Sequence, residues 1–166
     1  IAYLKAFGVK HNLETNVDEA GNVLIKKPAT PGKENLQTVI LQSHIDMVCE
    51  KNNDVQHDFL TDPIETEIDG EWLKAKGTTL GADNGIGVAT ELAILADDNI
   101  EHGPLECLFT VDEETGLTGA FELKEGFMSG DILLNLDSED EGEIFIGCAG
   151  GIDSVAEFSY KEVEVP

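Results

Sequence analysis

The chain has few basic residues. Ten Lys and Arg stand against 34 Asp and Glu, and the formal net charge over 166 residues is −24. Proteins that bind nucleic acid or an anionic membrane surface present cationic patches to the phosphates. The charge balance therefore argues against nucleic acid and membrane as partners. It suits a strongly solvated surface on which some carboxylates converge on metal ions.

Long apolar runs and paired cysteines are also missing. No segment approaches the ~18 consecutive apolar residues of a membrane-spanning helix. Cys49, Cys107 and Cys148 lie far apart and form no C-x-x-C pair, which disfavours a zinc knuckle or a disulfide framework. We expect reduced, inert thiols at core or strand positions and a cytoplasmic location.

What is present is an alternation of short apolar runs with helical patterns. It predicts one α/β domain, with a layered mixed β-sheet flanked by helices. The predicted strands are residues 11–16, 22–27, 38–42, 64–68, 71–76, 105–111, 131–136, 143–148 and 152–160. The predicted helices are 1–8, capped by Gly8, then 85–97 and 117–124, and the apolar face of the second is Ile86, Ala89, Leu92, Ala93 and Ala96.

Two turns are predicted from their residue types. Asp18 to Asn22, which contains Gly21, separates the first two strands. Asp69-Gly70 is a preferred pair for a two-residue hairpin turn.

Three successive carboxylates, Asp112, Glu113 and Glu114, follow the apolar run that ends at Val111. Carboxylates at the end of a buried strand are costly unless a positive charge offsets them. No basic residue follows before Lys124, so one or two divalent metal ions are the simplest source of that charge. Because neighbours on an extended segment point opposite ways, one glutamate can bind metal while the other acts as a general base. An acidic surface loop is the alternative.

His44 and Asp46 follow a β-branched run and are two residues apart, which places both side chains on one side of an extended segment. A metal-bound histidine usually donates its second ring N–H to an oxygen acceptor. His44 is thus a candidate ligand with Asp46 behind it. An ordinary exposed histidine in a turn is the alternative.

Asp83 lies among glycines, which allow a carboxylate to approach a crowded centre. Two metal ions about 3.5–4 Å apart need a shared carboxylate of this kind. One alternative is a helix N-cap by Asp83 or Asn84. Another is a dinucleotide-binding loop, but the third glycine of that pattern is replaced by Thr90.

Asp137 follows another apolar run and is a candidate strand-end ligand. The acidic residues after it imitate an EF-hand loop, yet its twelfth position is Cys148 rather than a glutamate. An acidic calcium-binding module over residues 137–148 remains the non-enzymatic alternative. His11, His57 and His102 lack a comparable context, and we expect structural or surface roles for them.

Together, these motifs resemble the co-catalytic di-zinc exopeptidases related to carboxypeptidase G, aminoacylase and carnosinase, and above all their aminoacyl-histidine dipeptidase branch. The resemblance covers essentially the whole chain. The segments that carry it are Ser43-His44-Ile45-Asp46-Met47-Val48, His57-Asp58-Phe59, Asp62-Pro63-Ile64, Thr79-Leu80-Gly81-Ala82-Asp83-Asn84-Gly85-Ile86-Gly87, Asp112-Glu113-Glu114-Thr115-Gly116-Leu117-Thr118-Gly119-Ala120 and Gly147-Cys148-Ala149-Gly150-Gly151.

The resemblance implies a zinc-exopeptidase-like catalytic domain that hydrolyses unblocked dipeptides such as Xaa-His. It implies two divalent metal ions, zinc first, with cobalt or manganese possible. Asp83 would bridge them, His44 and Asp137 would complete one site, and Glu114 would bind the other ion. Asp46 would orient His44, and Glu113 would be general base and then acid. A cis peptide bond would join Asp83 to Asn84.

The resemblance also implies parts that this sequence does not show. These are a distal histidine ligand, a lid or dimerisation domain through which the parent enzyme forms a homodimer, and a C-terminal catalytic segment. We therefore expect residues 1–166 to be the N-terminal part of the catalytic domain, to bind metal weakly or at one site, and to be inactive alone. A related aminoacylase or tripeptidase is the alternative activity.

Overall fold

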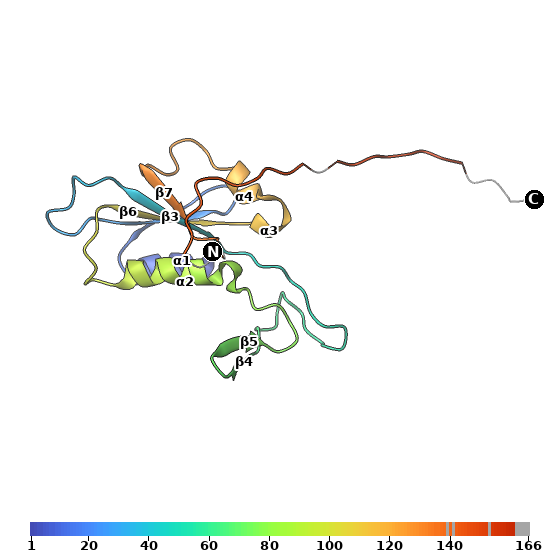
Figure 1. Cartoon of the computed structure of the whole chain (residues 1–166). Coiled ribbons are helices and arrows are strands. Elements are labelled where there is room, and N and C mark those ends of the chain that lie inside the picture. The colour runs from blue at the N-terminus through green and yellow to red at the C-terminus, as the bar shows by residue number, and fades with distance from the viewer. Residues whose placement is uncertain (139, 141, 153, 162–166) are drawn as a thin grey trace, which may run out of the picture.

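The centre of the fold is a five-stranded mixed sheet (Figure 1). The computed structural model describes residues 1–138, 140, 142–152 and 154–161. In spatial order the strands are β1 (Glu14–Val17), β2 (Val23–Lys27), β6 (Leu105–Thr110), β3 (Val39–His44) and β7 (Ile132–Asn135). β1, β2 and β6 pair antiparallel, whereas β6, β3 and β7 pair parallel. The predicted α/β class with a mixed sheet is confirmed.

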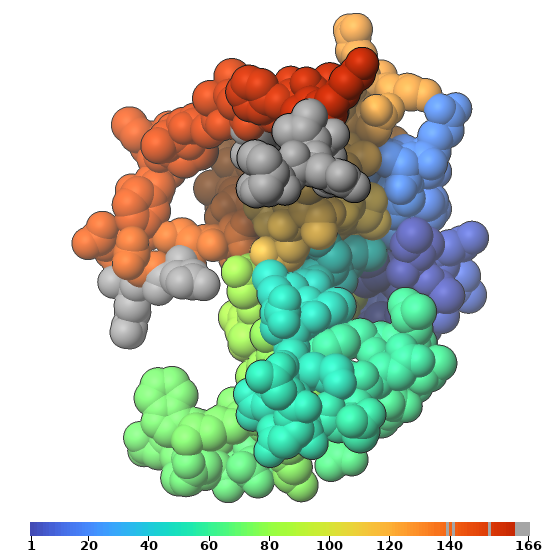
Figure 2. Space-filling model, turned by 90° about the vertical axis from the view of Figure 1, so that its right-hand side faces the viewer, coloured from blue at the N-terminus to red at the C-terminus, as the bar shows by residue number. Residues whose placement is uncertain are grey.

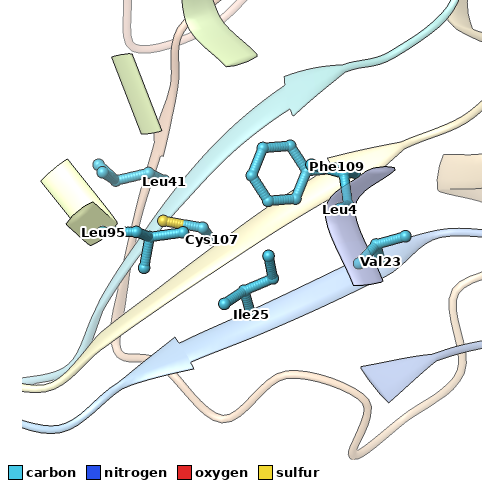
Figure 3. Close-up of a cluster of buried hydrophobic side chains, with 7 residues drawn as sticks. All are labelled: Leu4, Val23, Ile25, Leu41, Leu95, Cys107 and Phe109. Carbon is cyan, nitrogen blue, oxygen red and sulfur yellow. The ribbon is translucent and has the colours of Figure 1, made fainter. Parts of the chain in front are cut away.

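Helices α1 (Ala2–Lys10) and α2 (Ala82–Ala96) cover one face of this sheet (Figure 1). Because side chains alternate along a strand, β2 and β6 can supply apolar residues to both faces. The cluster under the helices contains Leu4, Val23, Ile25, Leu41, Leu95, Cys107 and Phe109 (Figure 3). A second cluster of Leu24, Ile40 and Leu108 packs against Leu123, Phe127 and Met128.

The parallel strands end at the same edge of the sheet. His44 pairs with Thr110, and Gln42 pairs with Asn135. The polar segments that follow β3, β6 and β7 therefore all begin at this edge, as in other sheets with parallel strands. This register brings distant motifs of the sequence into one region.

Two short helices, α3 (Glu113–Gly116) and α4 (Thr118–Phe121), follow β6 in place of the single predicted helix over 117–124. Leu117 separates them with a φ of 57°. The hairpin of β4 (Thr66–Asp69) and β5 (Trp72–Ala75) stands apart from the sheet (Figure 1). Its loop is Gly70-Glu71 rather than Asp69-Gly70, because Asp69 pairs with Trp72. The predicted turn before β2 is confirmed, since Asp18 Oδ1 accepts the backbone N–H groups of Gly21 and Asn22.

Helix α1 continues past the predicted cap at Gly8 and ends at Lys10. Gly8 is buried, and a Cβ added there would lie 1.9 Å from Thr15 Oγ1. The glycine therefore permits close packing against the start of β1 and does not cap the helix.

The buried face of α2 also differs from the prediction. Asn84, Gly87, Glu91 and Leu95 are buried, while Ile86 is 69% exposed. Of the five residues predicted to face the core, only Leu92 packs against it. The alanines in the predicted set gave little information about which face of the helix is buried. The buried face includes Gly87, which lets the helix approach β3 closely.

The two strands predicted at 143–148 and 152–160 are wrong for the described residues. Residues 142–152 and 154–161 form no strand and run away from the sheet (Figure 1). A strand depends on a paired neighbour, and the described part of the chain offers none to this segment. Residue 153 lies outside the described residues.

Among the helices of the described residues, none is both long and apolar enough to cross a lipid bilayer.

Candidate metal centre

His44 lies at the centre of the candidate site. It ends β3 and is 1% exposed. Its Nε2 is 3.0 Å from Asp83 Oδ1, 3.5 Å from Asp137 Oδ1 and 4.0 Å from Glu113 Oε2. Its Nδ1 is 3.0 Å from the backbone oxygen of Asp46. The ring is thus held between an oxygen acceptor on one side and three carboxylates on the other.

Asp46 contacts both parts of the site. Its Oδ1 lies 3.4 Å from His44 Nδ1. The same carboxylate accepts the backbone N–H groups of Glu113 and Glu114, each at 3.1 Å. Asp46 therefore connects the end of β3 to the start of α3.

Asp83 lies in the first turn of α2, where the backbone departs from helical geometry. Its φ and ψ are −87° and 110°, and the predicted cis peptide bond to Asn84 is present. The side chain of Asp83 is 50% exposed. The first turn of α2 is interrupted at Asp83 and Asn84, whose φ and ψ are not helical. In the described structure the side chains of these two residues bond to His44 and Asp137 and not to a helix N–H, which argues against the N-cap alternative.

Asp137 lies two residues beyond β7, and its side chain is 25% exposed. Asn84 Nδ2 donates a hydrogen bond to Asp137 Oδ1. The segment after β7 and the start of α2 are thereby joined through side chains, although 53 residues separate them in sequence.

Two groups of side chains are close enough to hold a metal ion. His44, Asp83 and Asp137 form one group, and His44, Glu113 and Glu114 form the other. Within each group, the potential ligand atoms lie within 4.8 Å of one another. The first group is the set expected for one zinc ion. The second places Glu113 beside Glu114, and neither group contains both Asp83 and Glu114.

The rings of the three other histidines contact residues close to them in sequence, although the backbone of His102 also bonds to Thr30. His11 stacks on Phe7 at 4.3 Å, His57 lies edge-on to Phe59 at 4.5 Å, and His102 Nδ1 lies 2.7 Å from Gly103 O. The cysteines are free, but only Cys107 is buried, whereas Cys49 and Cys148 are exposed. The expectation of core cysteines is thus right for one of three.

Burial and mutual repulsion shift the titration of the acidic residues. Burial raises the pKa of Glu113, and the charges of Asp137, Glu114 and Asp46 add to this, while His44 opposes it. Burial and the nearby Asp83 raise the pKa of Asp137, against the lowering effects of Asn84 and His44. Burial lowers the pKa of His44, but its hydrogen bond with Asp83 and the surrounding carboxylates outweigh burial, so the pKa is raised. The site attracts positive charge.

Three residues near the site were missed by sequence reasoning. Asn22 and Asn84 are buried amides that bond to site segments, and Glu91 is a fully buried acid beneath β3. Asn84 belongs to the recognised segment 79–87, where sequence reasoning gave it a possible N-cap role and the cis bond but no contact with Asp137. No signal in the sequence marked Glu91, because a glutamate in a helix is ordinarily exposed.

Two hollows adjoin the site. A cavity of about 250 Å³ is lined by the start of α2 and residues 136–138. A larger one of about 750 Å³ lies beside Glu113 and Asp137 and is walled mainly by apolar residues of β6, β7 and the segment 117–128. In Figure 2 the start of α2 (yellow-green) lies in a hollow between the hairpin (green) and the segment after β7 (orange).

The calcium-module alternative finds no support. An EF-hand loop needs a helix before it, and β7 precedes Asp137 instead. Residues 139 and 141 of that loop lie outside the described residues.

Comparison with known proteins agrees with this geometry. The model of peptidase family M20/M25/M40 matches residues 40–161. The chain is 54% identical over 164 residues to the cytosol non-specific dipeptidase of Escherichia coli (strain K12), covering 99% of this chain and 34% of the relative.

Two solved structures share the fold. The crystal structure of aminoacylhistidine dipeptidase from Vibrio alginolyticus has a TM-score of 0.82 and 59% identity, covering 84% of this chain and 29% of that one. Aminopeptidase PepT from Bacillus cereus has a TM-score of 0.69 and 26% identity, covering 84% of this chain and 37% of that one. The chain spans about a third of the length of the curated relatives it matches. Because the family model matches most of the chain, the chain belongs to peptidase family M20/M25/M40.

Proposed function

We propose that the protein containing these residues is a metal-dependent dipeptidase that hydrolyses unblocked dipeptides, including those that end in histidine. The convergence of His44, Asp83 and Asp137 at the carboxyl edge of the sheet is the observation that carries this proposal. The family supports it, and so do the names of the dipeptidases from Escherichia coli and Vibrio alginolyticus to which the chain is similar.

The donor set fits a pair of divalent metal ions. One imidazole and several carboxylates are nitrogen and oxygen ligands of the kind that zinc accepts, and cobalt or manganese can use the same donors. Within the described part of the chain, the lysine ion pairs involve Glu106, Glu101, Asp69 and Glu19, and none of these acids belongs to the site. Within the described residues, the carboxylates of the site therefore have no lysine partner to offset their charge.

We assign the roles as follows. His44, Asp83 and Asp137 would hold one ion, and Glu114 with the shared Asp83 would hold the other. Bound metal would lower the pKa of water and polarise the substrate carbonyl. Glu113 would take a proton from the attacking water and give it to the leaving amine. The 4.0 Å distance from its Oε2 to His44 Nε2 supports this role. Asp46 would keep His44 and the Glu113–Glu114 backbone in position.

The remaining assignments concern the whole protein. We propose that residues 1–166 form the first part of its catalytic domain and that a lid or dimerisation domain and a C-terminal segment with a further histidine ligand complete it. A homodimer is proposed on the same basis. The name of the Escherichia coli relative places that protein in the cytosol, and we propose the same compartment here.

The closest rival activity is tripeptide hydrolysis. It follows from the likeness to an aminopeptidase PepT and to a tripeptidase of Staphylococcus aureus, at 26% and 25% identity. The identities of 54% and 59% to dipeptidases favour the dipeptide. An aminoacylase has no specific observation in its favour.

The test uses the whole protein and a Glu113→Gln variant. We expect kcat for a dipeptide such as Ala-His to fall by about 100-fold to 10,000-fold while the bound zinc stays unchanged. Glu122→Gln, at an exposed glutamate just after α4, is the matched control. A wild-type protein that cleaves tripeptides or N-acyl amino acids in preference to dipeptides would overturn the substrate assignment.

A further inference from the structure

We propose that Asn84 is a positioning residue that holds the Asp137 carboxylate toward His44 and Asp83. This inference rests on the proposed function, because it concerns how one of the proposed metal sites is assembled. It adds a residue to the site that is neither a ligand nor a proton carrier in that proposal.

The contact is specific. Asn84 is 3% exposed, although the neighbouring Asp83 side chain is half exposed. Its Nδ2 donates to Asp137 Oδ1, the same oxygen that lies 3.5 Å from His44 Nε2. The amide therefore restrains the oxygen through which Asp137 approaches the histidine. It also ties Asp137 to the residue next to Asp83.

Asp137 has little other support. It follows β7, which pairs only with β3 among the described strands, and each residue of β7 is exposed. Its own backbone N–H donates to Asn135 Oδ1, and Leu136 N–H donates to Gln42 O. Among the described residues, Asn84 Nδ2 is the amide that donates to its carboxylate, and His44 Nε2 lies 3.5 Å from the same oxygen. The orientation of the carboxylate therefore depends in part on this amide.

Charge explains why an amide suits this position. Asp83 and Asp137 both approach His44 Nε2, at 3.0 and 3.5 Å, and two carboxylates this close repel each other. A neutral N–H donor stabilises one of them without adding charge. An aspartate at position 84 would have nearly the same shape but would add a third negative charge and remove the donor.

The Asn84 side chain packs against Gly87. A Cβ added to Gly87 would lie 1.9 Å from Asn84 Oδ1 and 3.0 Å from Ser43 Cβ. The side-chain oxygen of Asn84 thus occupies the space that any larger residue at 87 would fill, which leaves Nδ2 directed at Asp137. The hydrogen bond that the described structure gives the Asn84 side chain goes to Asp137 and not to a helix N–H, so helix capping does not account for the residue.

The experiment compares zinc binding by the whole protein and its Asn84→Ala and Asn84→Asp variants, using chelator competition and metal analysis. We expect both variants to lose affinity for one of two zinc ions by about 10-fold to 100-fold, the range seen when a group behind a metal ligand is removed. Asn99→Ala is the control, because Asn99 Nδ2 also donates to a carboxylate, that of Asp97, just beyond the other end of α2. It should bind zinc as the wild type does.

A second pair of variants tests the same contact without changing Asn84 itself, in case the Asn84 variants do not fold. Gly87→Ala should displace the amide and lower the same affinity, whereas Gly85→Ala, whose added Cβ would meet nothing within 4 Å, should not. Thermal unfolding of the metal-free proteins shows whether a variant has lost stability, so that a loss of zinc affinity can be told apart from a loss of folding. If the Asn84 variants unfold earlier but bind both ions with wild-type affinity, the proposal is wrong. If the wild-type protein binds no zinc, the proposed function fails instead.

Discussion

The Asp46 carboxylate accepts a hydrogen bond from the backbone N–H of Glu113, with 3.1 Å between Oδ1 and the nitrogen. Its second oxygen accepts the N–H of Glu114 at the same distance. Sequence spacing suggested only that Asp46 stands behind His44. The structure adds that one carboxylate fixes the segment that carries the proposed base as well as the histidine.

Replacement of Asp46 should therefore weaken both halves of the site. In the whole protein we expect Asp46→Ala to lower zinc affinity and kcat/KM by about 10-fold to 100-fold. Asp46→Asn keeps one acceptor oxygen, so zinc affinity and kcat/KM should fall less in this variant. Asp112→Asn is the control, because Asp112 bonds to Thr115 in the same turn and belongs to neither ligand group. Wild-type zinc affinity in Asp46→Ala would contradict the assignment.

Asn22 stabilises the segment that carries Glu113 through hydrogen bonds to its backbone. It is fully buried, its Oδ1 accepts the N–H of Val111 at 3.1 Å, and its Nδ2 donates to Gly119 O at 2.8 Å. It thus holds both ends of the stretch that carries Glu113. Asn22→Ala leaves a buried donor and acceptor without partners, which should lower the free energy of unfolding by about 1–3 kcal/mol in urea titrations.

The control for Asn22 is Asn16→Ala, which removes an exposed amide bonded to Glu14. It should change the free energy of unfolding by less than about 0.5 kcal/mol. Equal effects of the two variants would show that the buried amide is not what stabilises the segment.

Glu91 makes stability depend on pH. It is fully buried, neither carboxyl oxygen meets hydrogen-bond geometry within the described structure, and burial raises its pKa from 4.5 to about 8. Ser43 on β3 and Cys107 on β6 face the carboxyl and only partly offset burial. At neutral pH the folded protein therefore keeps this carboxyl largely protonated.

The sign of the pH effect follows from linkage. Below pH 4.5 the carboxyl is protonated in both states, and its contribution to stability is fully present. As the pH rises from there through about 8, the unfolded chain ionises freely while the folded protein must retain its proton, so stability is lost. Above that range the loss is complete and stays constant.

Glu91→Gln cannot ionise and should not show this loss. We expect the free energy of unfolding of the wild type, from urea titrations, to fall relative to that of the variant as the pH rises from about 5 to about 8, by on the order of a few kcal/mol in total. Glu122→Gln, at an exposed position, should follow the wild type. Parallel profiles for the wild type and Glu91→Gln would show that the buried carboxyl does not titrate in this range.

Local chemistry made much of the fold predictable. The strands that became β2, β3, β6 and β7 were predicted because each contains a short run of apolar or β-branched residues, as in residues 38–42, bounded by polar residues or turns. The ligand candidates were predictable for a related reason, since carboxylates and a histidine at strand ends are costly without a positive charge. The cis bond between Asp83 and Asn84 was implied by resemblance and not by composition.

Other features depended on contacts between distant segments. The strands predicted at 143–148 and 152–160 did not form in the described part of the chain, because strand formation needs a neighbour and not only a suitable sequence. The orientation of α2 followed from the close approach of Gly87 to β3, which the pattern of alanines could not reveal. Asn22, Asn84 and Glu91 were missed because their burial arises only when α2 and the loops pack on the sheet.

The sequence by itself determined the family motifs, the α/β class and the chemical types of ligand at the site, because these depend on residue identity and on short-range periodicity. Only the tertiary structure decided which oxygens meet at His44, since the parallel register of β3, β6 and β7 brings together residues that lie far apart in the chain. It also decided which polar groups are buried behind them, because burial is a property of packed elements and not of any one segment.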